Sequence, residues 1–244
     1  MRNIRLTIEY DGTKYHGWQI QSNAVTIQGV LQRAIRGLTG ENVTLIGCSR
    51  TDVGVHALGH IANFPTESNI PPDRFSFALN RMLPEDIVIK SSEEVSMDFH
   101  ARFCAKGKTY RYLFYNAQFP SALHRYRAYH VSHNLDVQAM ADAGQFFLGT
   151  HDFSAFRASG SDTRTSVRTI TELQVQRKDD LVEMKITGDG FLYNMVRIIA
   201  GTLTEVGAGK LKPEDIPGII ESKKRKLAGR TAPAHGLYLV EVFY

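Results

Sequence analysis

The first ten residues alternate between apolar and polar positions, which is the pattern of a strand with one buried face. The apolar positions are Ile4, Leu6, Ile8 and Tyr10. Asp11-Gly12 then predicts a turn. Apolar residues next recur every three or four positions, at Ile27, Val30, Leu31, Ala34, Ile35 and Leu38. This spacing predicts an amphipathic helix, with Thr26 as its N-cap and Gly40 as its terminator.

Three further strands and one helix are predicted in the first hundred residues. The strands are expected at 43–48, at 60–64 and from Ile87 to Ile89, and the helix follows Pro71-Pro72 and carries Phe75, Leu79 and Met82. The resulting order, β-α-β-β-α-β, is that of a ferredoxin-like unit, in which two helices cover one face of an antiparallel sheet.

A similar succession of elements follows residue 100. It comprises strands at 110–114 and 129–132, a helix at 137–148 ending at Gly149, a hairpin of strands at 169–176 and 181–187, a long helix from Leu192 to Val206, a short helix at 213–226 and a final strand at 237–244. We therefore predict an α+β fold of two ferredoxin-like halves with mainly antiparallel sheets, residues 1–100 and 101–244, which form a central cleft.

Composition is that of a globular protein, with 43% hydrophobic and 22% charged residues. Twenty-nine Lys and Arg against 25 Asp and Glu give a net charge of +4 and a pI near 9.0, which mildly supports a polyanionic partner. Two cysteines, without a signal segment or an apolar run long enough to span a membrane, indicate a reduced, cytoplasmic setting.

The stretch 48–57, Cys-Ser-Arg-Thr-Asp-Val-Gly-Val-His-Ala, is the candidate active site. Arg50 and Asp52 lie two apart and would project to the same side of an extended segment. Gly54 lets the backbone turn or approach a ligand closely. Asp-x-Gly alone is also common turn chemistry, so the argument depends on the whole string.

Residues 50–57 resemble the signature of the TruA family of tRNA pseudouridine synthases, although Ser49 stands where that family usually has Gly. The resemblance implies that Asp52 is the catalytic nucleophile and that Arg50 assists entry of the target nucleotide. It implies an isomerase that converts uridine to pseudouridine at positions 38–40 in the anticodon stem-loop of tRNA. It further implies a homodimer, a catalytic role for the central cleft, and no need for a cofactor or metal.

Three further residues acquire roles from the same resemblance. Tyr110, in Lys-Thr-Tyr-Arg-Tyr, matches the tyrosine that stacks on the target base. Arg197 closes the motif Phe-Leu-Tyr-Asn-Met-Val-Arg and matches the arginine that pairs with the catalytic Asp, although Tyr193-Asn194 replaces two frequent histidines. Leu237 matches the leucine that lines the uracil pocket, and His235 nearby replaces a commoner acidic residue. Without the resemblance, the sequence pattern favours a core aromatic side chain for Tyr110 and a solvent-exposed charge on a helix for Arg197.

The same residues allow other interpretations. Cys48, His56 and His60 are close in sequence, but the glycines around them argue against a helical zinc site. Ser49, His56 and Asp52 supply the side chains of a hydrolase triad, without a nucleophile elbow. An RNA-binding module without catalysis is a rival, but neither half shows the aromatic strings of such modules. A related enzyme acting on another RNA stays open.

Two groups of residues are assigned either to RNA contact or to ordinary structure. Trp18, the only tryptophan, lies in an aromatic, glycine-rich loop, and its size favours burial. The basic residues that could form a phosphate-binding surface are Arg33, Arg36, Arg164, Arg168, Lys223, Lys224, Arg225, Lys226 and Arg230. The sequence does not indicate which of them share a face.

Overall fold

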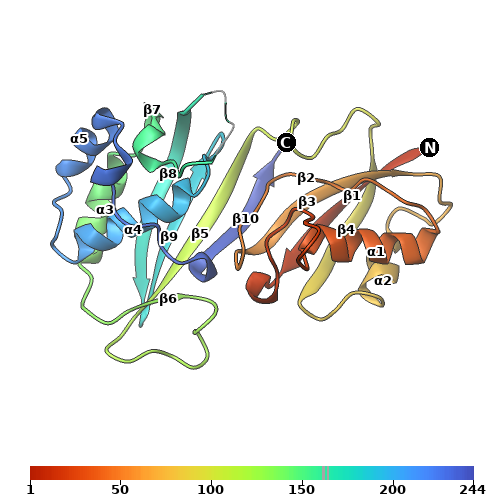
Figure 1. Ribbon diagram of the computed structural model, residues 1–244, viewed down its shortest axis with the longest axis horizontal. Helices are drawn as coiled ribbons and strands as arrows, with labels where there is room; N and C mark the ends of the chain where they lie inside the picture. The colour runs from red at the N-terminus through yellow and green to blue at the C-terminus, as the bar shows by residue number, and fades with distance from the viewer. Residues whose placement is uncertain (161–162, 164) are drawn as a thin grey trace. The chain divides into compact units, whose positions relative to one another are not determined.

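The computed structural model describes residues 1–160, 163 and 165–244, and these form two compact units. The first unit contains Met1–Lys106 and Tyr238–Tyr244, and the second contains Gly107–Leu237 (Figure 1). The final strand, predicted in the second half, clusters from Tyr238 onward with the first unit. No helix among the described residues has the length and apolar character needed to cross a membrane.

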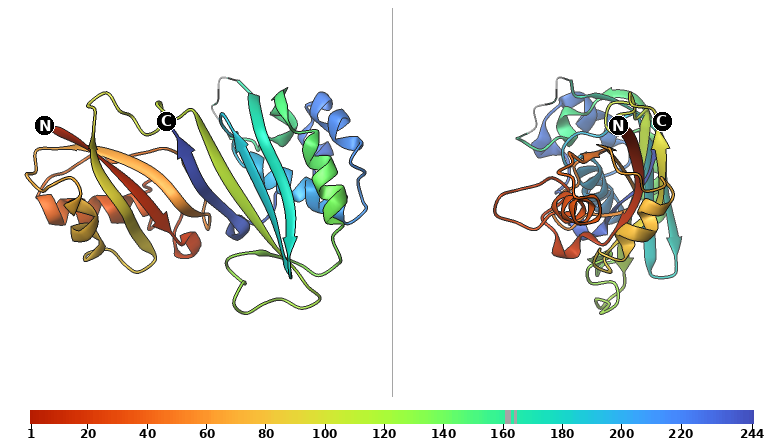
Figure 2. Two further views of the ribbon diagram at one scale, coloured as in Figure 1. Left: turned by 180° about the vertical axis from the view of Figure 1, so that it is seen from behind. Right: turned by 90° about the vertical axis from the view of Figure 1, so that its right-hand side faces the viewer.

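The first unit is built on a sheet in which β1 pairs antiparallel with both β4 and β3. Its elements are β1 (Arg2–Tyr10), α1 (Ile27–Thr39), β2 (Ile46–Gly47), β3 (His56–Thr66), α2 (Arg74–Asn80), β4 (Ile87–Val95) and, apart from its first residue, β10 (Leu237–Phe243). Strand β10 joins β3 in parallel, with Tyr238 opposite His56 and Leu239 opposite Ala57 (Figure 2). The predicted order of the first six elements is confirmed.

Helix α1 begins and ends where its capping residues predict. Thr26 accepts a hydrogen bond from the Gly29 N–H, which satisfies one of the amides that a helix leaves open at its start. Gly40 adopts a left-handed conformation, with φ of 77°, and its N–H reaches the Arg36 carbonyl. One face is buried, through Ile27, Leu31, Ala34 and Ile35.

Strand β2 is much shorter than predicted, because side chains of α1 bind the backbone that precedes it. Gln28 donates from Nε2 to the Leu45 carbonyl at 2.8 Å, and Gln32 donates to the Val43 carbonyl at 3.0 Å. Two of the carbonyls that a strand would offer to its neighbour are therefore occupied. The prediction of a strand over 43–48 was wrong except at Ile46–Gly47.

The second unit has a four-stranded antiparallel sheet in the order β5-β9-β8-β7, with β6 added in parallel to β5. The elements are β5 (Gly107–Asn116), β6 (Tyr129–Val131), α3 (Val137–Gln145), β7 (Gly149–Asp152), β8 (Val167–Lys178), β9 (Leu181–Gly188), α4 (Met195–Gly207) and α5 (Asp215–Ser222). The β8–β9 hairpin turns at Asp179, whose φ is 55°. Both units combine a mainly antiparallel sheet with helices, which confirms the α+β class.

Helix α3 ends four residues before the predicted terminator. Phe146, Phe147 and Leu148 each donate their N–H to the carbonyl three residues back, so the chain leaves the helix through tighter turns. Phe147 is fully buried and meets the Phe156 ring edge-on, with centroids 5.1 Å apart. Gly149, with φ of 95°, starts β7 rather than ending the helix. The apolar spacing continues past the end of the helix because Phe147, in the turns that follow, is also buried in the core.

Candidate active site

The loop that carries Asp52 connects β2 to β3 in the first unit. The Cys48 N–H donates to the Ile61 carbonyl at 2.8 Å, which continues the pairing with β3 up to the loop. Thr51 is buried, Asp52 is half-buried, and Gly54 turns the chain with φ of 77°. The Val55 N–H closes the turn on the Asp52 carbonyl at 3.1 Å. The carboxylate therefore lies on a defined turn next to a sheet.

A second loop, residues 11–19, holds the backbone on both sides of Asp52. The Trp18 N–H donates to the Thr51 carbonyl at 3.1 Å, and the Gly54 N–H donates to the Tyr15 carbonyl at 3.4 Å. Gly17 has φ of 76°, and a Cβ there would lie 2.4 Å from the Thr51 oxygen. The two loops approach so closely that only glycine fits at position 17.

Buried aromatic side chains support Thr51 from the core. The Tyr10 hydroxyl lies 2.8 Å from Thr51 Oγ1, and Trp18 stacks on His60 with ring centroids 3.7 Å apart. Trp18 is only 2% exposed, so the interpretation of this residue as part of the core is confirmed. Burial, together with a 2.5 Å hydrogen bond to Asp86, raises the pKa of Tyr15, which keeps this hydroxyl a donor.

Arg50 is held in place only weakly by its side-chain contact. Its side chain is exposed, and Nη1 donates to Gln19 Oε1 over a long 3.4 Å. Such a weak tether leaves the guanidinium able to exchange Gln19 for a phosphate or a base, since charged groups bind arginine more strongly than a neutral amide does.

The second unit contains the other three residues singled out by the sequence. Tyr110 lies on β5, is 7% exposed, and meets Phe191 edge-on at 5.2 Å. Arg197 lies on α4 and donates from Nε to the Ala232 carbonyl and from Nη1 to Asn194 Oδ1, both at 2.8 Å. Leu237, at the start of β10, is 6% exposed. Tyr110 and Arg197 are therefore held in fixed orientations by neighbours within their own unit.

The segment 229–232 is pressed against α4, and this contact positions Arg197. A Cβ at Gly201 would lie 1.7 Å from the Arg230 carbonyl oxygen. The Gly229 N–H donates to Thr202 Oγ1 at 2.9 Å, and the Ala232 N–H donates to the Arg197 carbonyl at 3.0 Å. The backbone that receives the Arg197 side chain is thus fixed by small residues on both surfaces.

Gly201→Ala is expected to destabilise the protein, whereas Gly218→Ala, in the exposed part of α5, is expected to stabilise it. A methyl group at Gly218 meets nothing within 4 Å and gains helix propensity of about 0.5–1 kcal/mol. The same change at Gly201 must displace backbone and should cost about 1–3 kcal/mol. Urea unfolding of both variants measures the change in the free energy of unfolding. Equal changes would mean that the segment 229–232 can move away from α4 without cost.

Tyr112 fixes the turn that precedes Leu237. Its hydroxyl donates to the Pro233 carbonyl at 2.7 Å, and a Cβ at Gly236 would lie 2.6 Å from its ring. Burial raises the pKa of Tyr112, and Arg197 and Arg230 oppose this only in part, so the hydroxyl stays a donor.

The candidate site residues divide between the two units. Tyr110, Arg197 and Leu237 belong to the second unit, and Arg50 and Asp52 belong to the first. The central catalytic cleft stays a prediction.

The His56 and His60 side chains both contact neighbouring residues of the first unit. His56 begins β3, where its Nδ1 lies 3.1 Å from both the Gly12 nitrogen and Asp11 Oδ1, and its ring stacks on Tyr238 at 4.7 Å. His60 Nδ1 lies 3.3 Å from the Tyr10 hydroxyl. Among the described residues, no three His, Cys, Asp or Glu side chains gather as metal ligands would. The described side chains therefore offer no ready-made set of zinc ligands around Cys48, His56 and His60.

Part of the basic run at 223–226 has a structural role that the sequence did not reveal. Arg225 donates to the Ala228 and Gly229 carbonyls and to Thr231 Oγ1, so it braces the segment against α4. Burial lowers the pKa of Arg225. Lys223 forms an ion pair with Asp152 at 2.9 Å. Arg164 lies outside the described residues.

The residues that hold the loop of Asp52 are not evident from the sequence. Tyr10 was assigned only to a strand, Thr51 was noticed only within the motif, and Gly17 only as part of an aromatic loop. The available signal was the glycine between two bulky residues in His16-Gly17-Trp18, because glycine in such a setting often marks close backbone approach. Nothing in a single sequence states which segment makes that approach.

Comparison with known proteins identifies close relatives over the full length. A family model described as tRNA pseudouridine synthase matches residues 6–104 and 143–244. The chain is 70% identical over 244 residues to a tRNA pseudouridine synthase A from Acetivibrio thermocellus, covering 100% of both chains. It is 58% identical over 245 residues to the protein of that name from Ruminiclostridium cellulolyticum, again covering 100% of both. A tRNA pseudouridine synthase A 2 from Clostridium tetani is 56% identical, covering 100% of this chain and 99% of the relative.

Proposed function

The chain belongs to the tRNA pseudouridine synthase family and is an isomerase of uridine in tRNA, and from this we propose that Asp52 is its catalytic nucleophile. The observation that carries the proposal is the geometry of the loop. A half-buried carboxylate stands on a turn whose backbone is hydrogen-bonded on both sides, at Thr51 and at Gly54. Such anchoring is what positions a reacting group in advance of substrate binding.

The reaction itself explains why one carboxylate is sufficient. Pseudouridine forms when the bond from ribose C1′ to uracil N1 breaks and a bond from C1′ to C5 replaces it. No atoms or electrons are gained or lost overall, so the chemistry calls for a nucleophile or base and for a pocket that retains the detached uracil while it turns. Asp52 supplies the nucleophile or base: it attacks the base or the sugar, or it removes a proton.

We assign binding of the target nucleotide to Arg50, Tyr110, Arg197 and Leu237. The exposed, weakly tethered Arg50 suits a residue that guides a nucleotide out of its stack. Phe191 holds the Tyr110 ring in place, which suits stacking on a base. The two hydrogen bonds of Arg197 suit a guanidinium that must present a fixed charge. Leu237 offers an apolar wall for uracil.

The substrate and setting are proposed more finely on the sequence resemblance. The target uridines are those at positions 38–40 of the anticodon stem-loop, and the working form is a homodimer in the cytoplasm. The relatives' names support tRNA as the substrate. Cys48 and the exposed Cys104 are both present as thiols, which is compatible with a reducing compartment.

Incubation with unmodified tRNA transcripts tests the proposal. Pseudouridine should appear at positions 38, 39 or 40, wherever the transcript has uridine there, as mapped by carbodiimide modification and primer extension. A transcript with cytidine at all three positions is the matched control and should stay unmodified. Modification that persists in this control, at other positions, would show a different target site. A wild-type protein that modifies neither transcript would contradict the assigned substrate.

A further inference from the structure

A groove of about 460 Å³ lies in the first unit, between α1 and the segments that precede and follow it. Its size is within the range of ligand-binding hollows in proteins. The lining residues that concern the argument are Gln21, Gly29, Arg33, Arg36, Asn42 and Thr44. Most of its wall is polar, so the groove suits a hydrophilic ligand.

The walls of the groove are preformed by hydrogen bonds. The Ile20 N–H donates to Gln28 Oε1 at 3.0 Å, and Gln32 Nε2 donates to the Val43 carbonyl at 3.0 Å, so both flanking segments are tied to α1. Gly29 lies between the walls, where a Cβ would be 3.1 Å from Thr26 Oγ1, which is a tight contact, and 3.8 Å from Arg33 Nη1, which is an ordinary one.

The groove is positively charged. Arg33 and Arg36 lie three residues apart on α1, which places them on neighbouring positions of one helix face. Both are exposed, and neither forms an ion pair with any residue that the structure describes. The lining contains no Asp or Glu. The two guanidinium groups are therefore available to an anion.

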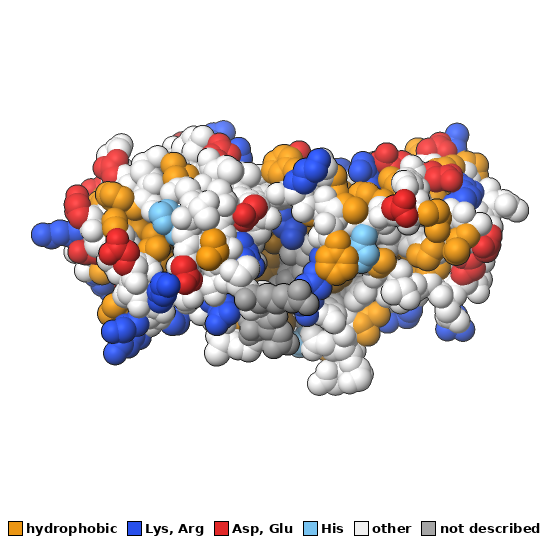
Figure 3. Space-filling model, turned by 90° about the horizontal axis from the view of Figure 1, so that it is seen from above, with side chains coloured by type: hydrophobic (Ala, Val, Ile, Leu, Met, Phe, Trp, Pro, Cys, Tyr) orange, Lys and Arg blue, Asp and Glu red, His pale blue; other side chains and the backbone are white. Residues whose placement is uncertain are grey.

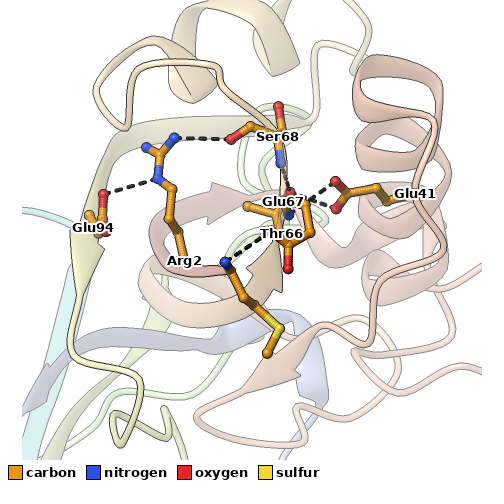
Figure 4. A network of polar contacts seen from close by, with 7 residues as sticks. Arg2, Glu41, Thr66, Glu67, Ser68 and Glu94 are labelled. Atoms are coloured by element: carbon orange, nitrogen blue, oxygen red, sulfur yellow. Dashed lines mark hydrogen bonds and ion pairs between the residues drawn. The ribbon is translucent and has the colours of Figure 1, made fainter.

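The nearest carboxylate in sequence, Glu41, is not among the residues that line the groove. Glu41 binds Thr66 Oγ1 at 2.6 Å and the Glu67 N–H at 3.1 Å, as Figure 4 shows. On the face drawn in Figure 3, acidic and basic side chains are interspersed. A concave site with two arginines and no acid in its lining is thus a local feature, which the modest net charge of the chain does not reveal.

The groove adjoins the loop that carries Asp52. Its wall residue Ile20 follows Gln19, whose side chain accepts the hydrogen bond from Arg50. The Gln28 N–H, on the helix that forms the other wall, donates to the Trp18 carbonyl at 3.0 Å. The groove and the loop that carries Asp52 are thus connected through Gln19 and Trp18 of the segment between them.

We propose that this groove binds the sugar-phosphate backbone of the tRNA beside the target nucleotide, with Arg33 and Arg36 as phosphate ligands. The proposal rests on the proposed function, because it takes tRNA as the polyanion. Backbone contacts fix the register of a nucleic acid without reading its sequence. The side-chain amides of Gln21 and Asn42 and the Thr44 hydroxyl add neutral donors for phosphate and ribose oxygens.

The test is tRNA affinity as a function of salt for wild type and for Arg33→Gln/Arg36→Gln, which keeps long polar side chains on a helix. Loss of two phosphate contacts should weaken binding roughly ten-fold at low salt and lower the slope of log Kd against log salt by about 1.5. The single-turnover rate with saturating tRNA should stay within about two-fold of wild type, since chemistry occurs at Asp52.

Two further variants make the result specific to the groove. Arg81→Gln removes an exposed arginine of the same unit outside the groove and should leave affinity and salt slope unchanged. Arg33→Lys/Arg36→Lys retains both charges and should recover most of the affinity, because lysine also binds phosphate as a point charge. Wild-type affinity and slope in the double Gln variant, confirmed as folded by circular dichroism, would overturn the proposal. Equal competition by poly-glutamate at matched charge would do so too, because it would assign the groove to acidic peptides.

The outcome separates this proposal from the proposed function. A wild-type protein that binds tRNA with the expected arginine dependence but forms no pseudouridine would refute the function and leave the groove assigned. An active wild type whose double Gln variant binds tRNA as tightly as wild type would refute the groove alone.

Discussion

Asp52→Asn is expected to lower the single-turnover rate of pseudouridine formation by about a thousand-fold or more, because it removes the proposed nucleophile. Asn is nearly isosteric with Asp and carries no charge. The turn that holds residue 52 is fixed by backbone contacts at Thr51 and Gly54, which the substitution does not alter. Thermal stability and tRNA affinity should therefore change little while turnover is lost.

The matched control is Asp73→Asn, which neutralises an aspartate of the same unit whose side chain is 68% exposed. Its rate should equal that of wild type. Mapping of pseudouridine in tRNA under single-turnover conditions, with circular dichroism of each variant, measures the effect. A substantial rate for the folded Asp52 variant would remove this residue from the chemistry.

Gly17→Ala is expected to reduce both stability and activity, because it pushes directly on the backbone next to Asp52. The added methyl group would lie 2.4 Å from the Thr51 oxygen, so either loop must shift. The left-handed backbone costs about 1–2 kcal/mol for alanine, and overpacking adds about 1–3 kcal/mol. A displacement of about 1 Å at a reacting group lowers rates by roughly a hundred-fold.

Gly40→Ala separates these two effects. Gly40 has nearly the same φ, 77° against 76°, but a Cβ there meets nothing within 4 Å. It should lose only the cost of the left-handed conformation, about 1–2 kcal/mol, and retain wild-type activity. Chemical unfolding and single-turnover rates of the two variants provide the comparison. If both lose the same stability and neither loses activity, then the approach of the two loops does not position Asp52.

Elements with complete local signals were predicted closely. Helix α1 has a capping threonine, an apolar stripe and a terminal glycine, and each acts as its type predicts. The β8–β9 hairpin has alternating strands and a polar turn. Where a contact from elsewhere in the chain decides the outcome, prediction failed. The Gln28 and Gln32 side chains shorten β2, and burial of Phe147 extends the helical spacing beyond α3.

The candidate site divides in the same way. Asp52 is identified by a motif, which is a local property of the chain. The close approach of Gly17 to Thr51, and of Gly201 to Arg230, joins segments that are distant in sequence, and no residue pattern at either end specifies its partner. The bracing role of Arg225 was hidden for another reason, because a lysine- and arginine-rich run has the composition of a solvated surface.

The return of β10 to the first unit has a consequence for how the protein is made on the ribosome. Strand β3 gains its parallel partner only when Tyr238 and Leu239 have emerged, after the whole of Gly107–Leu237 has been synthesised. At typical elongation rates of about 5–20 residues per second, that delay is on the order of ten seconds. During this time His56 and Ala57, at the start of β3, lack their partners on β10, and the contact of Tyr244 with Ala101 is missing. Its completion is therefore a late event of biosynthesis, although it begins the chain.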